Sequence, residues 1–193
     1  MPRGIVLIPG GGLGPHQPVL NYSWLAGTAR GAEALHLEWP ATRPKSRDPA
    51  DSASWVVEQV AAALDAWTVE RPVLVGKSLG TYAAEVAAAR SLPAVWHTPL
   101  LNDARCGAAL RSATAPFLLV GGTGDPYWDG ALARSLTPHV LEVPDADHGM
   151  VLPGRPLARS AAVLGQVVTA VERFLDVHVW PEHPGRAGGV GRR

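Results

Sequence analysis

A serine between two glycines stands where a predicted strand turns into a predicted helix. The segment Val73–Gly80, VLVGKSLG, contains the pattern G-x-S-x-G with Ser78 at its centre. A serine on so sharp a strand-to-helix turn presents its hydroxyl above the edge of the sheet. Gly76 and Gly80 suit the turn because side chains there would collide across it. These residue types in this order predict that Ser78 is a nucleophile.

A serine hydroxyl attacks only after a base takes its proton, and His148 is the best placed of the seven histidines. It lies in the loop Pro144–Gly149, after a predicted strand and before the last predicted helix. Ligands of parallel α/β sheets bind at the carboxyl ends of the strands, so this loop is at the expected edge. His16 is the rival base, but its glycine-rich loop favours a contact with the substrate.

The base needs a carboxylate that orients its ring, and Asp125 is the predicted partner. It follows another predicted strand in the segment GGTGDPYWD, and Asp129 in the same segment could replace it. Asp145 and Asp147 flank His148 but are interpreted as turn formers, because sequence neighbours seldom reach the far ring nitrogen. The chain order serine, aspartate, histidine, with one residue after each strand, favours Asp125.

Two backbone N–H groups must stabilise the oxyanion of an acyl-transfer reaction. Leu79, directly after the candidate nucleophile, supplies one. Gly11 in the loop after the first strand is predicted to supply the other, with Gly12 as the nearby alternative and substrate contact. A dinucleotide-binding loop is disfavoured because the run GGGLG does not match G-x-G-x-x-G, and Pro15 and Pro18 disturb the helix entry.

The elements that must position these residues alternate along the chain between short apolar runs and segments of helical periodicity. Strands are predicted at Gly4–Ile8, Ala34–Glu38, Pro72–Gly76, Ala94–His97, Pro116–Val120 and Val140–Val143. Helices are predicted at Val19–Arg30, 51–68, Thr81–Arg90 and Ala158–Leu175. The pattern predicts an α/β fold, a three-layer α/β/α sandwich around a mostly parallel sheet of about six strands.

Together these segments resemble the α/β-hydrolase superfamily over roughly residues 4–176. The resemblance rests on GKSLG, GGTGDPYWD, DADHG and IPGGGLG, and it is greatest to small, lidless bacterial serine hydrolases. It implies that Ser78 is the nucleophile, His148 the general base and Asp125 the orienting acid. It says nothing about the substrate.

The sequence departs from this family in two places. Pro9 stands where many relatives have a histidine before the oxyanion glycine, and larger relatives begin with two antiparallel strands for which there is no room before Gly4. Only about eighteen residues separate the strand ending at His97 from the one starting at Pro116. That length fits one short helix and predicts that the fold has no cap domain.

Aromatic residues at predicted strand ends could wall an apolar pocket beside the serine. The candidates for substrate binding are Trp39, Trp96, Tyr127 and Trp128. Packing between sheet and helices remains the alternative for each of them. Lys77, beside the candidate nucleophile, could form an ion pair, attract an anionic substrate, or simply be tolerated at a variable position.

Composition excludes several classes of protein. The 193 residues include 47% hydrophobic and 18% charged residues, enough for a core and too few charges for a disordered chain. Seventeen basic and seventeen acidic residues cancel, so nothing favours nucleic-acid binding. One cysteine excludes a disulfide framework, and no zinc-protease pattern occurs, so no metal or other cofactor is expected.

Residues 1–180 are expected to form one domain, followed by a disordered tail at 181–193 rich in Gly, Pro and Arg. No apolar run has the roughly 18 residues of a membrane span, and no secretory signal is recognised, which favours a cytoplasmic protein. Either a monomer or a homodimer fits the sequence.

The leading hypothesis is therefore hydrolysis of a small-molecule ester or thioester through an acyl-enzyme. A biosynthetic enzyme that transfers or cyclises the acyl group is an alternative, because another nucleophile can replace water. A binding module that keeps the fold without catalysis is a third possibility, since fold does not determine function.

Overall fold

The computed structural model describes residues 2–12, 14, 16–40 and 49–181; most of the predicted disordered tail lies outside this part. Its strands are β1 (Gly4–Ile8), β2 (Glu33–His36), β3 (Val73–Lys77), β4 (Ala94–His97), β5 (Phe117–Gly122) and β6 (Val140–Val143). Its α-helices are α1 (Pro18–Thr28), α2 (Pro49–Asp65), α3 (Ala84–Arg90), α4 (Ala104–Ser112), α5 (Gly130–Leu136) and α6 (Leu157–Phe174). A 3₁₀-helix, η1 (Ser78–Ala83), and a π-helical turn, η2 (Leu175–Val179), complete the list.

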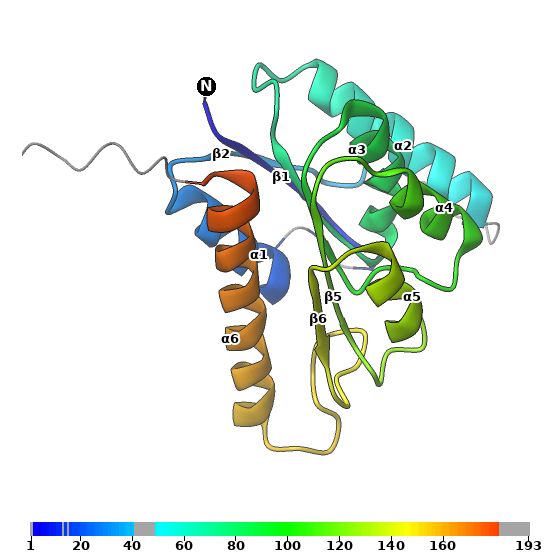
Figure 1. Cartoon of the computed structure of the whole chain (residues 1–193), viewed down its shortest axis with the longest axis vertical. Helices are drawn as coiled ribbons and strands as arrows, with labels where there is room; N and C mark the ends of the chain where they lie inside the picture. The colour runs from blue at the N-terminus through cyan, green and yellow to red at the C-terminus, as the bar shows by residue number, and fades with distance from the viewer. Residues whose placement is uncertain (1, 13, 15, 41–48, 182–193) are drawn as a thin grey trace, which may run out of the picture.

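The six strands form one sheet in the order β2-β1-β3-β4-β5-β6, and every pairing is parallel. The central strands β1, β3, β4 and β5 are buried along their whole lengths, as expected for strands covered on both faces. Helices α1 and α6 cover one face, and the other helices cover the opposite face (Figure 1). The predicted three-layer α/β/α sandwich is confirmed, and the sheet is parallel throughout.

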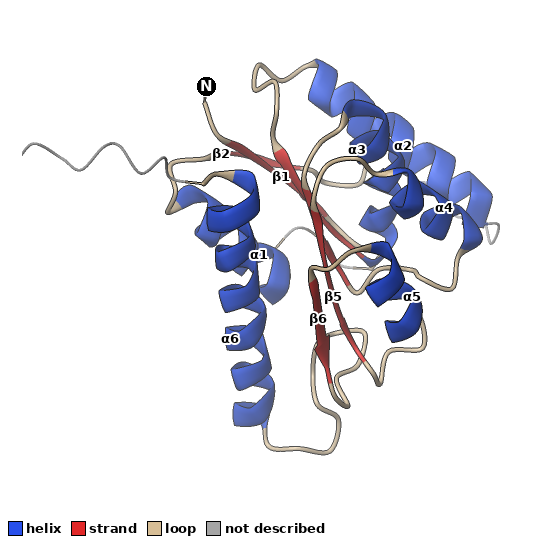
Figure 2. Ribbon diagram, in the orientation of Figure 1, coloured by secondary structure: helices blue, strands red, loops and turns tan. Residues whose placement is uncertain are grey.

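Each face of the sheet has its own apolar core. Val56, Val60 and Leu64 of α2 repeat at helical spacing and pack on one face; Val163, Val167 and Val171 of α6 do so on the other. Because all strands run the same way, their carboxyl ends meet at one edge of the sheet (Figure 2). Loops that leave this edge are therefore brought together from distant parts of the sequence.

Two local features differ from the sequence-based prediction, and a third agrees with it. Helix α5 was not predicted, although Asp129 caps it by accepting a hydrogen bond from the Leu132 N–H at 2.9 Å. The helix expected from Thr81 is preceded by η1, which begins at Ser78 itself. The connection between β4 and β5 contains one nine-residue helix, α4, in agreement with the predicted absence of a cap.

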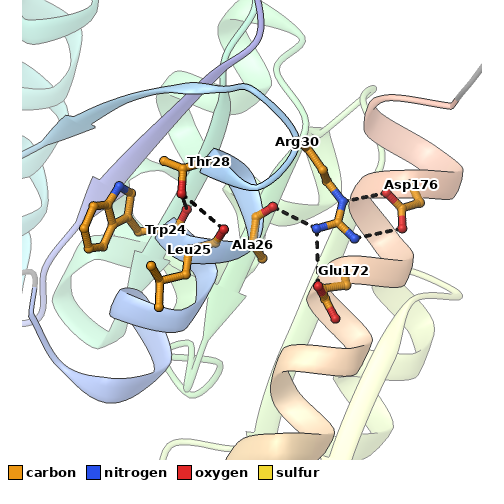
Figure 3. Close-up of polar contacts among 7 residues, drawn as sticks. All are labelled: Trp24, Leu25, Ala26, Thr28, Arg30, Glu172 and Asp176. Carbon is orange, nitrogen blue, oxygen red and sulfur yellow. Dashed lines mark hydrogen bonds and ion pairs between the residues drawn. The ribbon is translucent and has the colours of Figure 1, made fainter.

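A cluster of ion pairs joins α1 to the end of α6, far from the carboxyl edge (Figure 3). The guanidinium of Arg30 donates to both carboxylate oxygens of Asp176, at 2.5 and 2.8 Å, and to the carbonyl of Ala26 at 2.8 Å. Glu172 accepts a longer bond at 3.4 Å.

In the described part of the chain, no helix has the length and apolar character needed to cross a membrane.

Candidate active site

The turn after β3 holds Ser78 in a conformation that few residues adopt. Its φ is 51°, in the left-handed region that is strained for a side chain with a Cβ. A Cβ at Gly76 would come within 2.6 Å of Trp96, and one at Gly80 within 2.6 Å of the Ile8 carbonyl. The two glycines therefore allow the close approach that the predicted turn requires.

The side chains of the three predicted catalytic residues form a continuous hydrogen-bonded chain. The hydroxyl of Ser78 lies 2.8 Å from Nε2 of His148, and Nδ1 of the same ring lies 2.8 Å from Oδ2 of Asp125. Asp125 is a carboxylate and accepts only, so Nδ1 carries the proton and Nε2 can accept from the serine. This is the arrangement in which an imidazole acts as a base toward a hydroxyl.

The carboxylate of Asp125 is completely buried, whereas the imidazole of His148 keeps 30% of its side-chain exposure. The other carboxylate oxygen of Asp125, Oδ1, accepts a hydrogen bond from the backbone N–H of Tyr127 at 2.9 Å. The histidine loop is held in turn by Asp147, whose carboxylate accepts the N–H groups of Gly149 and Val151 at 2.8 and 3.0 Å. Asp147 thus has the turn-forming place predicted for it.

The glycine-rich loop after β1 lies beside the serine. A Cβ built on Gly10 would be 3.5 Å from the Cβ of Ser78, so the backbone of this loop runs directly past the hydroxyl. Gly11 and Gly12 line the same cleft as Ser78 and Leu79. Leu79 is the second residue of η1, and unpaired N–H groups at a helix start favour negative charge.

Trp39 supports this loop from behind. Its indole N–H lies 3.1 Å from both the Pro9 and the Gly10 carbonyl oxygens, and its ring packs edge-on against Trp55 with centroids 5.0 Å apart. Trp39 was predicted to contact substrate. Its indole N–H is used instead to fix the backbone that precedes Gly11.

An open cleft of about 610 Å³ surrounds the serine. Its wall combines apolar, aromatic and polar side chains from three loops. It is lined by Gly11, Gly12, Ser78, Leu79, Tyr82, Leu100, Asn102, Asp103, Tyr127 and His148. Tyr127 is 40% exposed, and its ring centroid lies 5.0 Å from that of His148. The hydroxyl of Tyr82 donates to the Asp103 carboxylate at 3.0 Å, so polar groups also line the cleft.

Four of the predicted substrate-binding residues do not line this cleft. Trp96 is only 1% exposed and packs under Gly76, so it belongs to the core. The ring of Trp128 packs against Gly121, and its indole N–H donates to Glu142 at 2.7 Å. The remaining two are Trp39, which braces the loop, and His16, whose exposed ring stacks near His36 at 5.9 Å.

The sequence analysis missed the wall formed by Leu100, Asn102 and Asp103. All three follow β4, so the rule that sites form after strand ends would have found them. They carry no motif of their own, and Asp103 also caps α4 by accepting the Cys106 N–H at 2.9 Å. Among the described residues, no three His, Cys, Asp or Glu side chains gather as metal ligands would.

Comparisons with known proteins give the fold but no close relative. No protein-family model and no curated protein matches the chain. An α/β serine hydrolase homologue from Coxiella burnetii is 16% identical, with a TM-score of 0.64 over 90% of this chain and 85% of that one. The chain has the fold of the α/β serine hydrolases.

Two further structures show the same similarity. XC6422 from Xanthomonas campestris, a serine hydrolase without a lid, is 17% identical, with a TM-score of 0.54 over 95% of this chain and 86% of that one. Est1E from Butyrivibrio proteoclasticus, solved with ferulic acid bound, is 14% identical, with a TM-score of 0.67 over 93% and 90%. The predicted resemblance to the superfamily, lidless members included, is confirmed at the level of fold.

Proposed function

We propose that this protein is a serine hydrolase that cleaves a small-molecule ester or thioester through an acyl-enzyme. The observation that carries this proposal is the hydrogen-bonded chain of Ser78, His148 and Asp125, with the strained serine facing an open cleft. A structural serine and histidine need neither the strained backbone nor the buried carboxylate. Their combination is what an activated nucleophile requires.

In the first half of the reaction the oxygen of Ser78 attacks the substrate carbonyl while Nε2 of His148 takes the hydroxyl proton. The resulting imidazolium is stabilised by Asp125, and the oxyanion receives the N–H groups of Leu79 and Gly11. Collapse breaks the bond to the leaving group, which departs as an alcohol or thiol with the proton from His148. The serine is left acylated.

In the second half water attacks the acyl-enzyme, and His148 takes its proton. A second tetrahedral oxyanion collapses, the proton returns to Ser78, and the carboxylic acid leaves. Because the cleft is open, water can reach the acyl group directly. This favours hydrolysis over acyl transfer or cyclisation, both of which require another nucleophile to outcompete water.

The lining of the cleft is suited to binding a substrate with an acyl group of small or medium size. Leu100 and Tyr127 offer apolar contacts in the cleft, whereas Asn102 and Asp103 add polar groups to its lining. A volume of about 610 Å³ lies within the range of small-molecule sites. We therefore place short acyl and aryl esters ahead of long-chain lipids.

The experiment is a panel of p-nitrophenyl esters from acetate to laurate, alongside the matching acyl thioesters. The wild type is expected to hydrolyse the shorter members, with an initial burst of chromophore equal to the enzyme concentration if the acyl-enzyme accumulates. The variant S78A is the control and should show no turnover. A wild type that is folded but inactive on every ester and thioester would contradict the proposal.

A further inference from the structure

Lys77 is a buried cation next to the candidate triad. It ends β3, precedes Ser78 and is only 5% exposed, which is rare for a lysine. Successive strand residues point to opposite faces, so Lys77 points away from the face on which Gly76 meets Trp96. Its ammonium donates to the backbone carbonyl of His148 at 3.0 Å. It does not line the cleft.

The titratable groups around Lys77 come from two loops and one strand. Asp125 follows β5, and Asp147 belongs to the loop between β6 and α6; both attract the ammonium. His97 pairs in register with Lys77 on β4. Burial lowers the pKa of Lys77 below its usual value, and the two carboxylates act in the opposite direction.

His97 is not a second cation at this place. Complete burial and the nearby ammonium of Lys77 lower its pKa to about 3, so it is neutral at physiological pH. Its Nε2 lies 2.9 Å from the hydroxyl of Ser23, which itself donates to the Val19 carbonyl at 2.7 Å. Lys77 is therefore the cation whose charge acts on the buried carboxylate of Asp125.

We infer that Lys77 is a positioning residue of the active site, which anchors the His148 backbone and balances the charge of Asp125 while the imidazole is neutral. A buried carboxylate without a partner charge strongly favours proton uptake nearby. With the ammonium in place, the charge of Asp125 is compensated in the resting site, where Nε2 of His148 lies within hydrogen-bond distance of the Ser78 hydroxyl. The imidazolium then forms together with the oxyanion, whose negative charge compensates it.

This inference rests on the proposed function, and it predicts a particular change in the pH profile. Removing the ammonium leaves Asp125 uncompensated, so protonation of the imidazole becomes easier. The acidic limb of kcat/KM should then move to higher pH. Loss of the bond to the His148 carbonyl should also lower kcat, by about 10–100-fold, because misplacement of a catalytic group is costly. KM should change little, because Lys77 does not touch the cleft.

The experiment measures the rate of serine labelling by a fluorophosphonate against pH, together with ester kinetics, for the wild type and three variants. Lys77→Met removes charge and hydrogen bond, Lys77→Gln keeps an N–H donor without the charge, and Lys77→Arg keeps the charge. Arg90→Met is the matched control: it removes one positive charge at an ion pair with Asp65, away from the site. Thermal unfolding of each protein reports folding.

We expect the acidic midpoint to rise in the Met and Gln variants, to stay in the Arg variant and to be unchanged in Arg90→Met. If Lys77→Met does not fold, Lys77→Gln carries the same charge test. An active wild type whose midpoint is the same in Lys77→Gln overturns the inference and leaves the proposed function intact. A wild type that neither reacts with the fluorophosphonate nor hydrolyses esters overturns the proposed function, and the inference with it.

Discussion

The described part of the molecule contains two serine–histidine hydrogen bonds of almost equal length, in very different surroundings. Ser78 and His148 are 2.8 Å apart at the carboxyl edge of the sheet, whereas Ser23 and His97 are 2.9 Å apart inside the core. In the core the serine hydroxyl donates to the carbonyl of Val19, so it accepts from the imidazole. A short distance between hydroxyl and imidazole therefore does not make a nucleophile.

Three features distinguish the pair at the edge. The carboxylate of Asp125 accepts a hydrogen bond from Nδ1 of His148, whereas Nδ1 of His97 has no hydrogen-bond partner among the described residues. The backbone of Ser78 is strained and opens onto the cleft, whereas Ser23 is buried in α1. The edge pair has the surroundings that the proposed proton transfer requires, whereas the core pair joins α1 to β4.

The largest difference should appear when each serine is replaced. Ser78→Ala should lower kcat by about 10⁵–10⁶-fold with little change in thermal stability, because it removes the nucleophile. Ser23→Ala should leave kcat within about threefold and lower the free energy of unfolding by about 1–3 kcal/mol, because the buried imidazole loses its partner. Ester hydrolysis and urea unfolding measure both. Equal loss of activity in both variants would erase the distinction.

The carboxylate beside His148 also distinguishes the two pairs, and Asp125→Asn replaces this carboxylate with a neutral amide. The amide can present its N–H to Nδ1 of His148 and so favour the wrong tautomer, which should lower kcat by about 10³–10⁴-fold. Asp129→Asn is the matched control, since Asp129 caps α5 and should affect stability by about 1 kcal/mol at most. Steady-state kinetics on one ester suffices. An Asp125→Asn variant with full activity would show that a residue other than Asp125 orients the imidazole of His148.

The core pair should affect how the free energy of unfolding depends on pH, and should leave the catalytic activity unchanged. The folded pKa of His97 lies at about 3 against 6.5 for the free side chain, so the unfolded chain binds more protons between these values. The free energy of unfolding should therefore fall as pH drops below 6.5, by up to about 1.4 kcal/mol per pH unit. His97→Gln keeps a donor for Ser23 and should flatten this slope. Urea unfolding from pH 7.5 to 4.5 compares the two proteins; parallel slopes would show that His97 does not contribute.

The smallest effect should come from the ion pairs at the other end of the molecule. The hydrogen bond from Arg30 lowers the pKa of Asp176 below 3.8, so this pair stabilises at neutral pH and loses its effect as pH falls below that value. Asp176 is half exposed, and Asp176→Asn should cost only about 0.2–1 kcal/mol, less at high salt. Unfolding at 20 mM and 500 mM NaCl should show this, with esterase activity unchanged. A larger and salt-insensitive loss would mean that the bond of Arg30 to Ala26 also depends on this pair.

Sequence patterns predicted the parts of the fold that depend on local chemistry. The alternation of apolar runs located all six strands, and β1, β4 and β6 have the predicted bounds. A proline follows each of these three runs within two residues. Helix α5 was not predicted because its seven residues lack a clear apolar stripe. The glycine spacing predicted the turn that carries Ser78, and the strand-end rule brought His148 and Asp125 to the same edge.

The walls of the site could not be predicted in the same way. Trp39 follows β2 and Trp96 lies near the end of β4, yet Trp39 hydrogen-bonds a loop and Trp96 is buried. Which of these happens depends on the neighbouring side chains that fill the space. Lys77 shows the same limit. Its burial and its bond to the His148 carbonyl arise from contacts across more than seventy positions of the chain.

Intact-mass analysis after reaction with a fluorophosphonate tests the central claim most directly, on the wild type, Ser78→Ala and Ser23→Ala. The account predicts one adduct on the wild type and on Ser23→Ala, none on Ser78→Ala, and the modified peptide at Ser78. A folded wild type without an adduct, or an adduct that persists in Ser78→Ala, would contradict it.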